Sequence, residues 1–489
     1  MNYSSTRNHN LTVSSAKAIA TGLAGDGGLF LPVEIPALTS EDFKYLKGCD
    51  YKTRAKEILG RFLTDFSDDE LEYCCGGAYL GNFDNDMPAP VKKLDEQKNV
   101  LELWHGPTCA FKDLALQILP YLMTVSVKKT GSKNKTVILV ATSGDTGKAA
   151  LEGFCDVDGT AIMVFYPTDG VSNMQKMQMA TQKGSNVNVC AINGNFDDAQ
   201  SGVKQIFGNE ECAKLLENNG CSFSSANSIN WGRLAPQIVY YISAYLDMDC
   251  PKEMNVVVPT GNFGNILAAY YAKEMGVPIK KLICASNSNN VLTDFINTGV
   301  YNKNRDFYTT VSPSMDILIS SNLERLLYLL SGDDTLVSSL MEQLKTDGKY
   351  TVPADLLAKL QQSFCGGYCN EEKTLQTIKD TFDKYGYLID THTAVAMAVA
   401  NDYAANTGDT TPMLIVSTAS PYKFSPAVCK AVGAKTDGDE FKTVENLEKA
   451  TDTIAPAPIK DLKNKEIRFK TVVDKENMTD EVLKFLGIK

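Results

Sequence analysis

Short apolar runs alternate with longer helix-like patterns through most of the chain. The runs lie at residues 136–141, 161–166, 186–192, 255–258, 281–285 and 413–416. Helical patterns follow at 149–154 and 265–275. Near-continuous apolar strands that alternate with helices are typical of a parallel sheet covered on both faces. The pattern therefore predicts an α/β protein.

The strand ends indicate where a ligand would bind. Ligands of open parallel sheets lie beyond the carboxyl ends of the strands. We therefore expect the turns after Ala141, Val258 and Val416 to line a site.

The pattern differs between parts of the chain and predicts four segments. Residues 1–95 contain a Gly-rich stretch and then helices, as expected of a small N-terminal domain. Residues 96–320 form the α/β core, and residues 321–390 form a mostly helical, polar insertion. Residues 391–489 form the C-terminal part of the core.

One lysine has surroundings that suit covalent chemistry. Lys112 lies between Phe111 and Asp113, after a Gly106-Pro107 turn signal and before an apolar helical pattern. Burial lowers the pKa of an ammonium group, and a neutral amine can form a Schiff base with an aldehyde such as pyridoxal phosphate. Taken alone, the triplet fits a surface lysine better, and a chemical role for Lys112 rests on four other segments.

The first of these segments follows the strand that ends at Ala141. Residues 142–147 form a Gly-rich turn before a helix, whose N-terminal amides can face an anion. Ser143, Asp145 and Thr146 add polar side chains. A P-loop is excluded because the chain has Thr142 and Ala149 where that motif needs Gly and Ser or Thr. A simple helix cap by Ser143 or Asp145 is about as probable as a ligand site.

The second segment, residues 259–265, repeats the order of strand, Gly-rich loop and helix. Gly261 and Gly264 allow backbone amides to approach a phosphate closely. Asn262 and Asn265 can add side-chain donors. One loop could hold a cofactor phosphate and the other an anionic part of a substrate.

Two further segments carry candidate polar groups. Residues 416–425 place Thr418 at a strand end, where its hydroxyl could face a pyridine nitrogen or simply cap the strand. Residues 228–233 contain Arg233, which could bind a carboxylate or phosphate through its planar fork. From chemistry alone, residues 228–233 are better explained as an interface tryptophan, Trp231, beside a surface arginine.

Composition narrows the class of protein. The chain has 48 basic and 59 acidic residues and a net charge of −11, which argues against nucleic acid or an anionic membrane as partner. Thirteen cysteines, scattered without ligand-like spacing, favour free thiols in a reducing compartment and no metal site. No apolar run approaches the roughly 20 residues of a membrane helix. We therefore expect a cytoplasmic protein.

Together these segments resemble the threonine synthase family, in its longer branch. The matching residues are 4–7, 22–32, 105–117, 142–147, 227–233, 259–265, 316–325, 392–395 and 417–424. The resemblance implies a pyridoxal-phosphate enzyme of fold type II. Its parallel-type sheets would be flanked by helices in two core domains, with a small N-terminal domain and a helical insertion.

The resemblance also implies roles for individual residues. Lys112 would carry pyridoxal phosphate, the loop Gly261, Asn262, Phe263, Gly264 and Asn265 would cradle its phosphate, and Thr418 would face its ring nitrogen. Ser143, Asp145 and Thr146 would line the substrate side, with Asn230, Arg233 and Lys423 as candidates for the substrate's anionic groups. Ser420 departs from the family pattern, which has histidine there.

The implied reaction converts O-phospho-L-homoserine and water into L-threonine and phosphate. The nearest alternative is a pyridoxal-phosphate-dependent phospho-lyase or a serine/threonine dehydratase of the same fold. A non-catalytic ligand-binding homologue is disfavoured, because it has no need for Lys112. We expect a small-molecule substrate as the partner of a monomer or small homo-oligomer.

Overall fold

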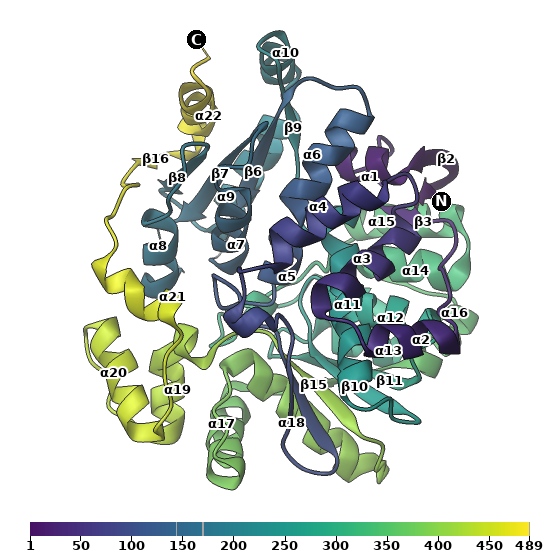
Figure 1. Ribbon diagram of the computed structural model, residues 1–489, viewed down its shortest axis with the longest axis vertical. Helices are drawn as coiled ribbons and strands as arrows, with labels where there is room; N and C mark the ends of the chain where they lie inside the picture. The colour runs from purple at the N-terminus through teal and green to yellow at the C-terminus, as the bar shows by residue number, and fades with distance from the viewer. Residues whose placement is uncertain (143, 169–170, 489) are drawn as a thin grey trace.

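The computed structural model describes residues 1–142, 144–168 and 171–488, and two parallel sheets organise them (Figure 1). The five-stranded sheet has the order β16-β8-β7-β6-β9, and all its neighbours run parallel. Its strands are β6 (Lys135–Ala141), β7 (Thr160–Pro167), β8 (Val187–Ile192), β9 (Cys221–Ser224) and β16 (Val472–Val473).

The six-stranded sheet has the order β14-β11-β10-β15-β5-β4. All neighbours are parallel except β4, an antiparallel edge strand. Its strands are β4 (Val91–Lys93), β5 (Lys98–Glu102), β10 (Met254–Pro259), β11 (Ile279–Ser286), β14 (Phe364–Tyr368) and β15 (Met413–Ser417). All six strands that the sequence predicts are confirmed, as β6, β7, β8, β10, β11 and β15.

Both faces of each sheet are covered, as continuous apolar strands require. In β10, Val256 and Val258 join one buried cluster and Val257 joins the opposite one, because successive side chains alternate across a sheet. Helices α11 (Trp231–Asp247), α12 (Gly264–Glu274), α13 (Val291–Thr298) and α16 (Ala354–Ser363) contribute to the first cluster. Helices α17 (Glu371–Tyr385), α18 (Thr391–Thr407), α19 (Ser425–Val432) and α20 (Glu440–Thr451) contribute to the second.

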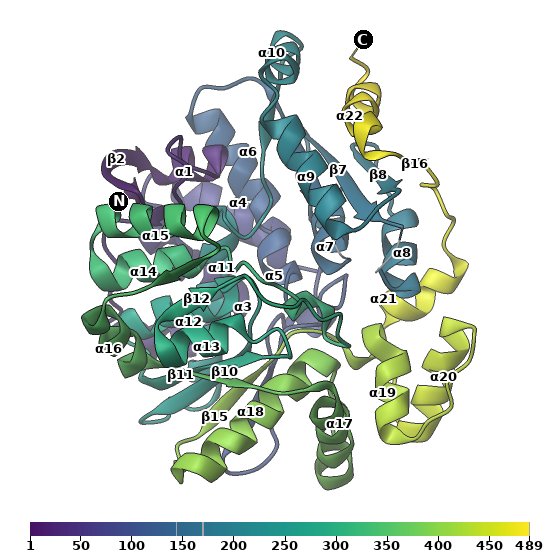
Figure 2. The same cartoon turned by 180° about the vertical axis from the view of Figure 1, so that it is seen from behind.

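The five-stranded sheet is covered in the same way. One face packs on α5 (Asp113–Leu116), α6 (Leu119–Lys129), α7 (Asp145–Phe154) and α8 (Asn173–Ala180). The other face packs on α9 (Phe196–Phe207), α10 (Glu210–Asn218) and α22 (Met478–Leu486). The C-terminal segment passes from α20 through α21 (Ala457–Lys460) to β16 and α22, and so joins the outer edge of this sheet (Figures 1 and 2).

The N-terminal region is built around a small antiparallel sheet of order β2-β1-β3. Its elements are β1 (Asn2–Ser5), β2 (Asn8–Ser14), β3 (Phe30–Pro32), α1 (Ser15–Thr21), α2 (Ser40–Lys47), α3 (Tyr51–Phe62) and α4 (Asp68–Tyr79). Tyr3 and Phe62 belong to the same buried cluster as Val256 of the six-stranded sheet. The region therefore shares its core with that sheet, and the division into four segments stays a prediction.

The segment between β11 and β15 is mainly helical. Besides α13, α16, α17 and α18 it contains α14 (Leu323–Ser331), α15 (Asp334–Thr346) and a two-stranded antiparallel sheet of β12 (Val300–Asn302) and β13 (Lys349–Thr351). It also supplies β14 to the six-stranded sheet, which the helical pattern did not predict. No helix of the described ranges has the length and hydropathy to span a bilayer. The cytoplasmic location stays a prediction.

Candidate active site

The loops after β5, β6, β10 and β15 supply most of the candidate residues, and α5 lies between the two sheets (Figures 1 and 2). Lys112 immediately precedes α5. Its segment is tied to the loop after β15, because the Phe111 N–H donates to the Thr418 carbonyl at 2.9 Å and the Ser420 N–H donates to the Cys109 carbonyl at 3.1 Å. Lys112 and Thr418 are thus held together by backbone bonds.

The turn before Lys112 is fixed by Asp113. Its carboxylate accepts from the Thr108 N–H at 2.9 Å and from the Thr108 hydroxyl at 2.6 Å. Burial raises the pKa of Asp113 to about 6, although both bonds from Thr108 oppose this. Cys109, within the turn, has a left-handed backbone with φ of 56°. A non-glycine residue in that conformation is strained, and such strain persists only where surrounding contacts impose it.

The Lys112 amine is largely enclosed, with 11% of its side chain exposed. Its Nζ lies 3.7 Å from Asp145 Oδ2 and 3.4 Å from Ser314 Oγ. Burial lowers the pKa of Lys112 to about 8; Asp145 opposes this shift, and the cations Lys423 and Arg233 add to it. A larger fraction of the amine is therefore uncharged near neutral pH than in an exposed lysine, and the uncharged amine is the nucleophilic form.

Asp145 and Lys423 form a buried ion pair. Lys423 Nζ lies 2.6 Å from Asp145 Oδ1, with side-chain exposures of 0% and 4%. Lys423 also donates to the Thr108 carbonyl at 2.9 Å, and Gln175 donates to Asp145 at 3.0 Å. Burial raises the pKa of Asp145, but Lys423 and Lys112 outweigh it and hold that pKa well below its usual value.

The turn at the start of α7 is closed by Thr142, which the sequence did not mark as a candidate site residue. The hydroxyl of Thr142 accepts from the N–H groups of Gly144 at 3.0 Å and Gly147 at 2.9 Å. Gly144 is the N-cap and no side chain caps it, so the alternative in which Asp145 caps the helix is wrong. Thr146 is half-buried in the first turn. Ser143 lies outside the described residues.

The loop from Gly261 to Asn265 has the backbone geometry of an anion cradle. A Cβ on Gly261 would lie 2.7 Å from the Ser314 carbonyl oxygen. Phe263 is left-handed, with φ of 62°, and is the N-cap of α12 without a side-chain cap. The first N–H groups of α12 are thus available to a ligand. Asn265 Oδ1 accepts from two tyrosine hydroxyls, whereas its buried Nδ2 has no partner among the described residues.

Residues from the N-terminal region and α14 support this loop. Asn322 donates from its backbone and from its side chain to the Asn262 carbonyl, each at 3.1 Å. The fully buried Arg325 donates to Asn322 Oδ1 at 2.6 Å and to the Phe30 carbonyl at 2.9 Å. The segments around residues 30 and 316–325 therefore act as scaffolding for the loop.

The three remaining candidates differ in their contacts. Arg233 is buried and donates to the Ala226 carbonyl at 2.7 Å; burial lowers its pKa to about 10. No acidic partner for it occurs among the described residues, so it can receive an anion. Asn230 is the N-cap of α11, and its amide bonds Gly232, Ile19 and Ser225. Thr418 is buried and follows β15 directly.

Two residues of the site were missed by the sequence argument. Ser314 contacts Lys112, lies 3.5 Å from Asp145 Oδ2 and donates its N–H to His392 Nε2 at 3.2 Å. His392 is oriented by Asp390, whose Oδ2 lies 2.8 Å from His392 Nδ1. Neither Ser314 nor His392 lies in a turn that follows a strand. The family resemblance of residues 392–395 indicated His392, and no sequence signal indicated Ser314.

Comparison with known proteins bears on this geometry. Profiles described as "Threonine synthase N terminus", "Pyridoxal-phosphate dependent enzyme" and "Threonine synthase, C-terminal" match residues 2–79, 92–419 and 393–483. The chain belongs to the threonine synthase family. It is accordingly a pyridoxal-phosphate-dependent enzyme of fold type II, and the predicted fold class and cofactor are confirmed.

Relatives of this threonine synthase family member cover nearly all of it. Threonine synthase of Pseudomonas aeruginosa is 38% identical, over 88% of this chain and 90% of its own. Human threonine synthase-like 1 is 43% identical over 86% of this chain, but the chain spans only 58% of that relative's length. The structure of PLP-bound threonine synthase from Brucella melitensis has a TM-score of 0.89, 38% identity and 99% coverage of both chains. Yeast threonine synthase has a TM-score of 0.90, 33% identity and the same coverage.

The residues of this family member fit pyridoxal phosphate. Lys112 supplies an amine of lowered pKa for the aldehyde. The uncapped N-terminus of α12, the absence of room for a Cβ at Gly261 and the unpartnered Asn265 Nδ2 suit a phosphate. All three groups lie in the segment that the sequence predicts as the phosphate loop.

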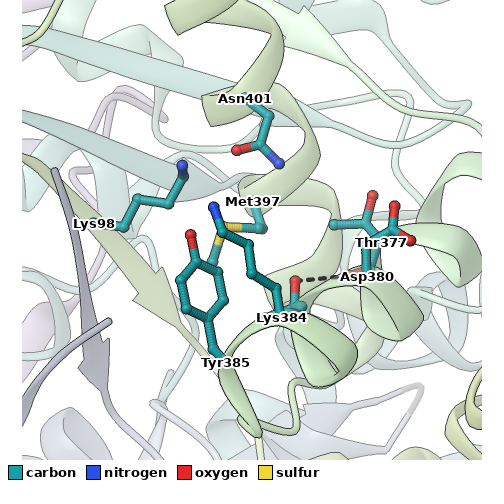
Figure 3. Close-up of a pocket in the computed structure, with 8 residues that line it drawn as sticks. Lys98, Thr377, Asp380, Lys384, Tyr385, Met397 and Asn401 are labelled. Carbon is teal, nitrogen blue, oxygen red and sulfur yellow. Dashed lines mark hydrogen bonds between the residues drawn. The ribbon is translucent and has the colours of Figure 1, made fainter. Parts of the chain in front are cut away.

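A separate hollow of the family member lies away from these residues (Figure 3). It is lined by Lys98, Thr377, Asp380, Thr381, Lys384, Tyr385, Met397 and Asn401. Lys98 is the first residue of β5, so this hollow is at the opposite end of the strand from the Lys112 segment. It contains none of the candidate residues, and we do not assign it to the reaction.

Proposed function

We propose that this family member is a threonine synthase, which converts O-phospho-L-homoserine and water into L-threonine and phosphate. The observation that carries the proposal is Lys112, a buried amine with a pKa lowered to about 8, beside Asp145 and Ser314 and joined by backbone bonds to the Thr418 loop. When bound, pyridoxal phosphate supplies an electron sink that stabilises a carbanion on the substrate.

The chain's own residues would do the rest. Lys112 would hold the cofactor through its uncharged amine, and its Nζ could accept and return protons at the substrate. The amides at the start of α12 and Asn265 Nδ2 would hold the cofactor phosphate, and Thr418 would face the ring nitrogen. Burial of these groups excludes water and so strengthens their electrostatic interactions.

The substrate adds a carboxylate and a second phosphate, which need further donors. Arg233 is a buried cation for which the described part of the chain offers no acidic partner, and it is our candidate for one of these anions. Ser143 and Thr146 remain candidates at the start of α7. Asn230 stays a prediction, although its amide already bonds three groups of the protein.

A second candidate activity is a phospho-lyase that releases phosphate and forms 2-oxobutyrate and ammonia. It is considered because the relatives that are 43% identical are named threonine synthase-like 1 and not threonine synthase, a name that does not assign the product. Both activities would use Lys112 and the same phosphate loop. They differ in whether water adds to the carbon skeleton before release.

Product analysis separates the two. The protein is incubated with pyridoxal phosphate and O-phospho-L-homoserine, and threonine, 2-oxobutyrate and phosphate are measured together. Threonine equal to phosphate supports the synthase, whereas 2-oxobutyrate equal to phosphate supports the lyase. Lys112→Ala should abolish either product. Lys148→Met is the matched control, because the Lys148 side chain is similarly enclosed, 7% exposed against 11% for Lys112, but bonds Glu152 and Gln182. Phosphate release by Lys112→Ala at the rate of the unmodified protein would contradict the proposal.

A further inference from the structure

Lys423 is a buried cation to which the sequence argument gave a substrate-binding role. It lies in the 3-10 turn η3 (Pro421–Phe424), directly after β15 and its Thr418 loop. Its side chain is completely buried, and its ammonium group already contacts Asp145 Oδ1 at 2.6 Å and the Thr108 carbonyl at 2.9 Å. These contacts are to the protein's own groups, so Lys423 has another use.

The ion pair joins the two sheets next to the Lys112 amine. Asp145 starts α7, which follows β6 of the five-stranded sheet, and Lys423 follows β15 of the six-stranded sheet. The second carboxylate oxygen, Oδ2, lies 3.7 Å from Lys112 Nζ. One carboxylate is thus shared between two lysines, one on each oxygen.

Stability alone is a weak reason for such a pair. Burying two charges costs several kcal/mol per ion, and a well-packed apolar pair of similar volume is often as stable or more stable. Removing one partner, by contrast, leaves an uncompensated buried charge and is strongly destabilising. The ion pair is therefore best explained by a role in fixing the negative charge of Asp145 at one position.

We propose that Lys423 is a positioning residue that holds Asp145 as a carboxylate turned toward Lys112, and thereby sets how readily Lys112 releases its proton. This inference deepens the proposed function, since it concerns the amine that would carry the cofactor. Lys423 acts on Lys112 through Asp145, which its ammonium group contacts directly, and its predicted role in substrate binding stays a prediction.

The other charged and titratable groups around the pair are few. Arg233 of α11 helps to lower the pKa of Lys112, and Lys423 opposes the rise in the pKa values of Asp113 of α5 and of Cys109. His392 of α18 accepts from the Ser314 N–H, and the Ser314 hydroxyl contacts Lys112. Gln175 of α8 donates to Asp145 at 3.0 Å and carries no charge. Asp145 is the nearest anion to Lys112, which makes it the main opposing influence on the burial of that amine.

The geometry predicts opposite effects for the two partners. Lys423→Met removes a cation and leaves Asp145 to Lys112 alone, so the pKa of Lys112 should rise. Asp145→Asn removes the anion and leaves Lys112 facing Lys423 and Arg233, so its pKa should fall. An opposite charge within about 4–6 Å shifts a pKa by about 1 to 3, and the fall in Asp145→Asn should be of that order, since Asp145 lies 3.7 Å from Lys112 Nζ.

The experiment measures Lys112 in the cofactor-free protein and so needs no substrate. Acetic anhydride is applied across a pH series, and acetylation of the Lys112 peptide is quantified by mass spectrometry. Lys148→Met is the matched control, because it removes a buried lysine of α7 that pairs with Glu152 and should leave the Lys112 titration unchanged. Lys423→Arg keeps the charge and should restore part of the original titration.

A raised pKa of Lys112 in Lys423→Met, together with a lowered pKa of Lys112 in Asp145→Asn, supports the proposal. An unchanged Lys112 titration in either variant overturns it, as does an equal shift in Lys148→Met. If Lys423→Met does not fold, the near-isosteric Asp145→Asn decides alone by the same criterion. Because the readout is chemical labelling of apoprotein, a failure here is distinct from a failure to form threonine.

Discussion

Gly261 offers a sharp test of the phosphate loop. A Cβ at this position would lie 2.7 Å from the Ser314 carbonyl oxygen, whereas ordinary contact begins at 3.4 Å, so Gly261→Ala requires a separation of about 0.7 Å (3.4 minus 2.7). The obstacle is backbone, which cannot rotate away as a side chain can. Overpacking of this kind costs about 1–3 kcal/mol.

The clash also affects the site itself. Ser314 contacts Lys112 and His392, so its displacement moves groups around the amine. If the loop moves instead, its N–H groups leave the phosphate position. At about 1.4 kcal/mol per factor of ten, a penalty of about 1–3 kcal/mol for restoring the loop on binding weakens pyridoxal phosphate binding by about 5- to 150-fold.

Gly264→Ala, three residues later, is the matched control for the stability of the apoprotein and not for cofactor affinity, because Gly264 belongs to the same loop. Its Cβ would meet only side-chain atoms, the nearest being Asn322 Nδ2 at 3.5 Å, and α12 gains a better helix former. We expect Gly261→Ala to lower the urea midpoint of the apoprotein and Gly264→Ala to hold stability within about 0.5 kcal/mol. Cofactor affinity is measured by absorbance titration. The packing argument would be refuted if Gly261→Ala and Gly264→Ala had equal urea midpoints and Gly261→Ala bound pyridoxal phosphate with unchanged affinity.

Three further predictions concern the amine, its neighbour and the scaffold. Because Lys112 reacts as the uncharged amine and its pKa is about 8, the rate of cofactor attachment to apoprotein should rise with pH and level off above that value; a rate independent of pH would contradict the assignment. Ser314→Ala removes contacts of 3.4 and 3.5 Å, so kcat should fall by less than about tenfold, and a loss above about 100-fold would instead indicate proton transfer by the hydroxyl. Arg325→Lys cannot reproduce the planar fork that binds the Asn322 side chain and the Phe30 carbonyl, so the free energy of unfolding in urea should fall by about 2 kcal/mol or more. The control Arg61→Lys, at a partly exposed pair with Asp42, should lose about 0.5 kcal/mol or less. Equal losses in the two variants would contradict a special role for Arg325.

The strands were predictable because their signal is local. Continuous apolar runs such as 136–141 and 255–258 can only be buried on both faces, and they form β6 and β10 as expected. The glycines after these strands mark turns for the same local reason. β14 was missed because its sequence, Phe364–Tyr368, contains two glycines and lacks a long apolar run.

The candidate site was only partly predictable. Lys112, the Gly261 loop and Thr418 stand out in the sequence because each follows a strand or turn signal. Ser314 has no such signal, and its importance comes from contacts with residues 202 and 78 positions away. Asp145 and Lys423 were both proposed as substrate groups because each was considered alone, and a sequence does not show that two charges face one another.

The sequence by itself determined the α/β class, the strands and the turns that carry chemistry, since periodicity and turn residues act over a few positions. The tertiary structure alone decided which charges meet. It pairs Lys423 with Asp145 across two sheets, encloses Lys112 and gives Arg233 no acidic partner in the described ranges. Burial and distance set the pKa of an amine, and both arise only when segments hundreds of residues apart pack together.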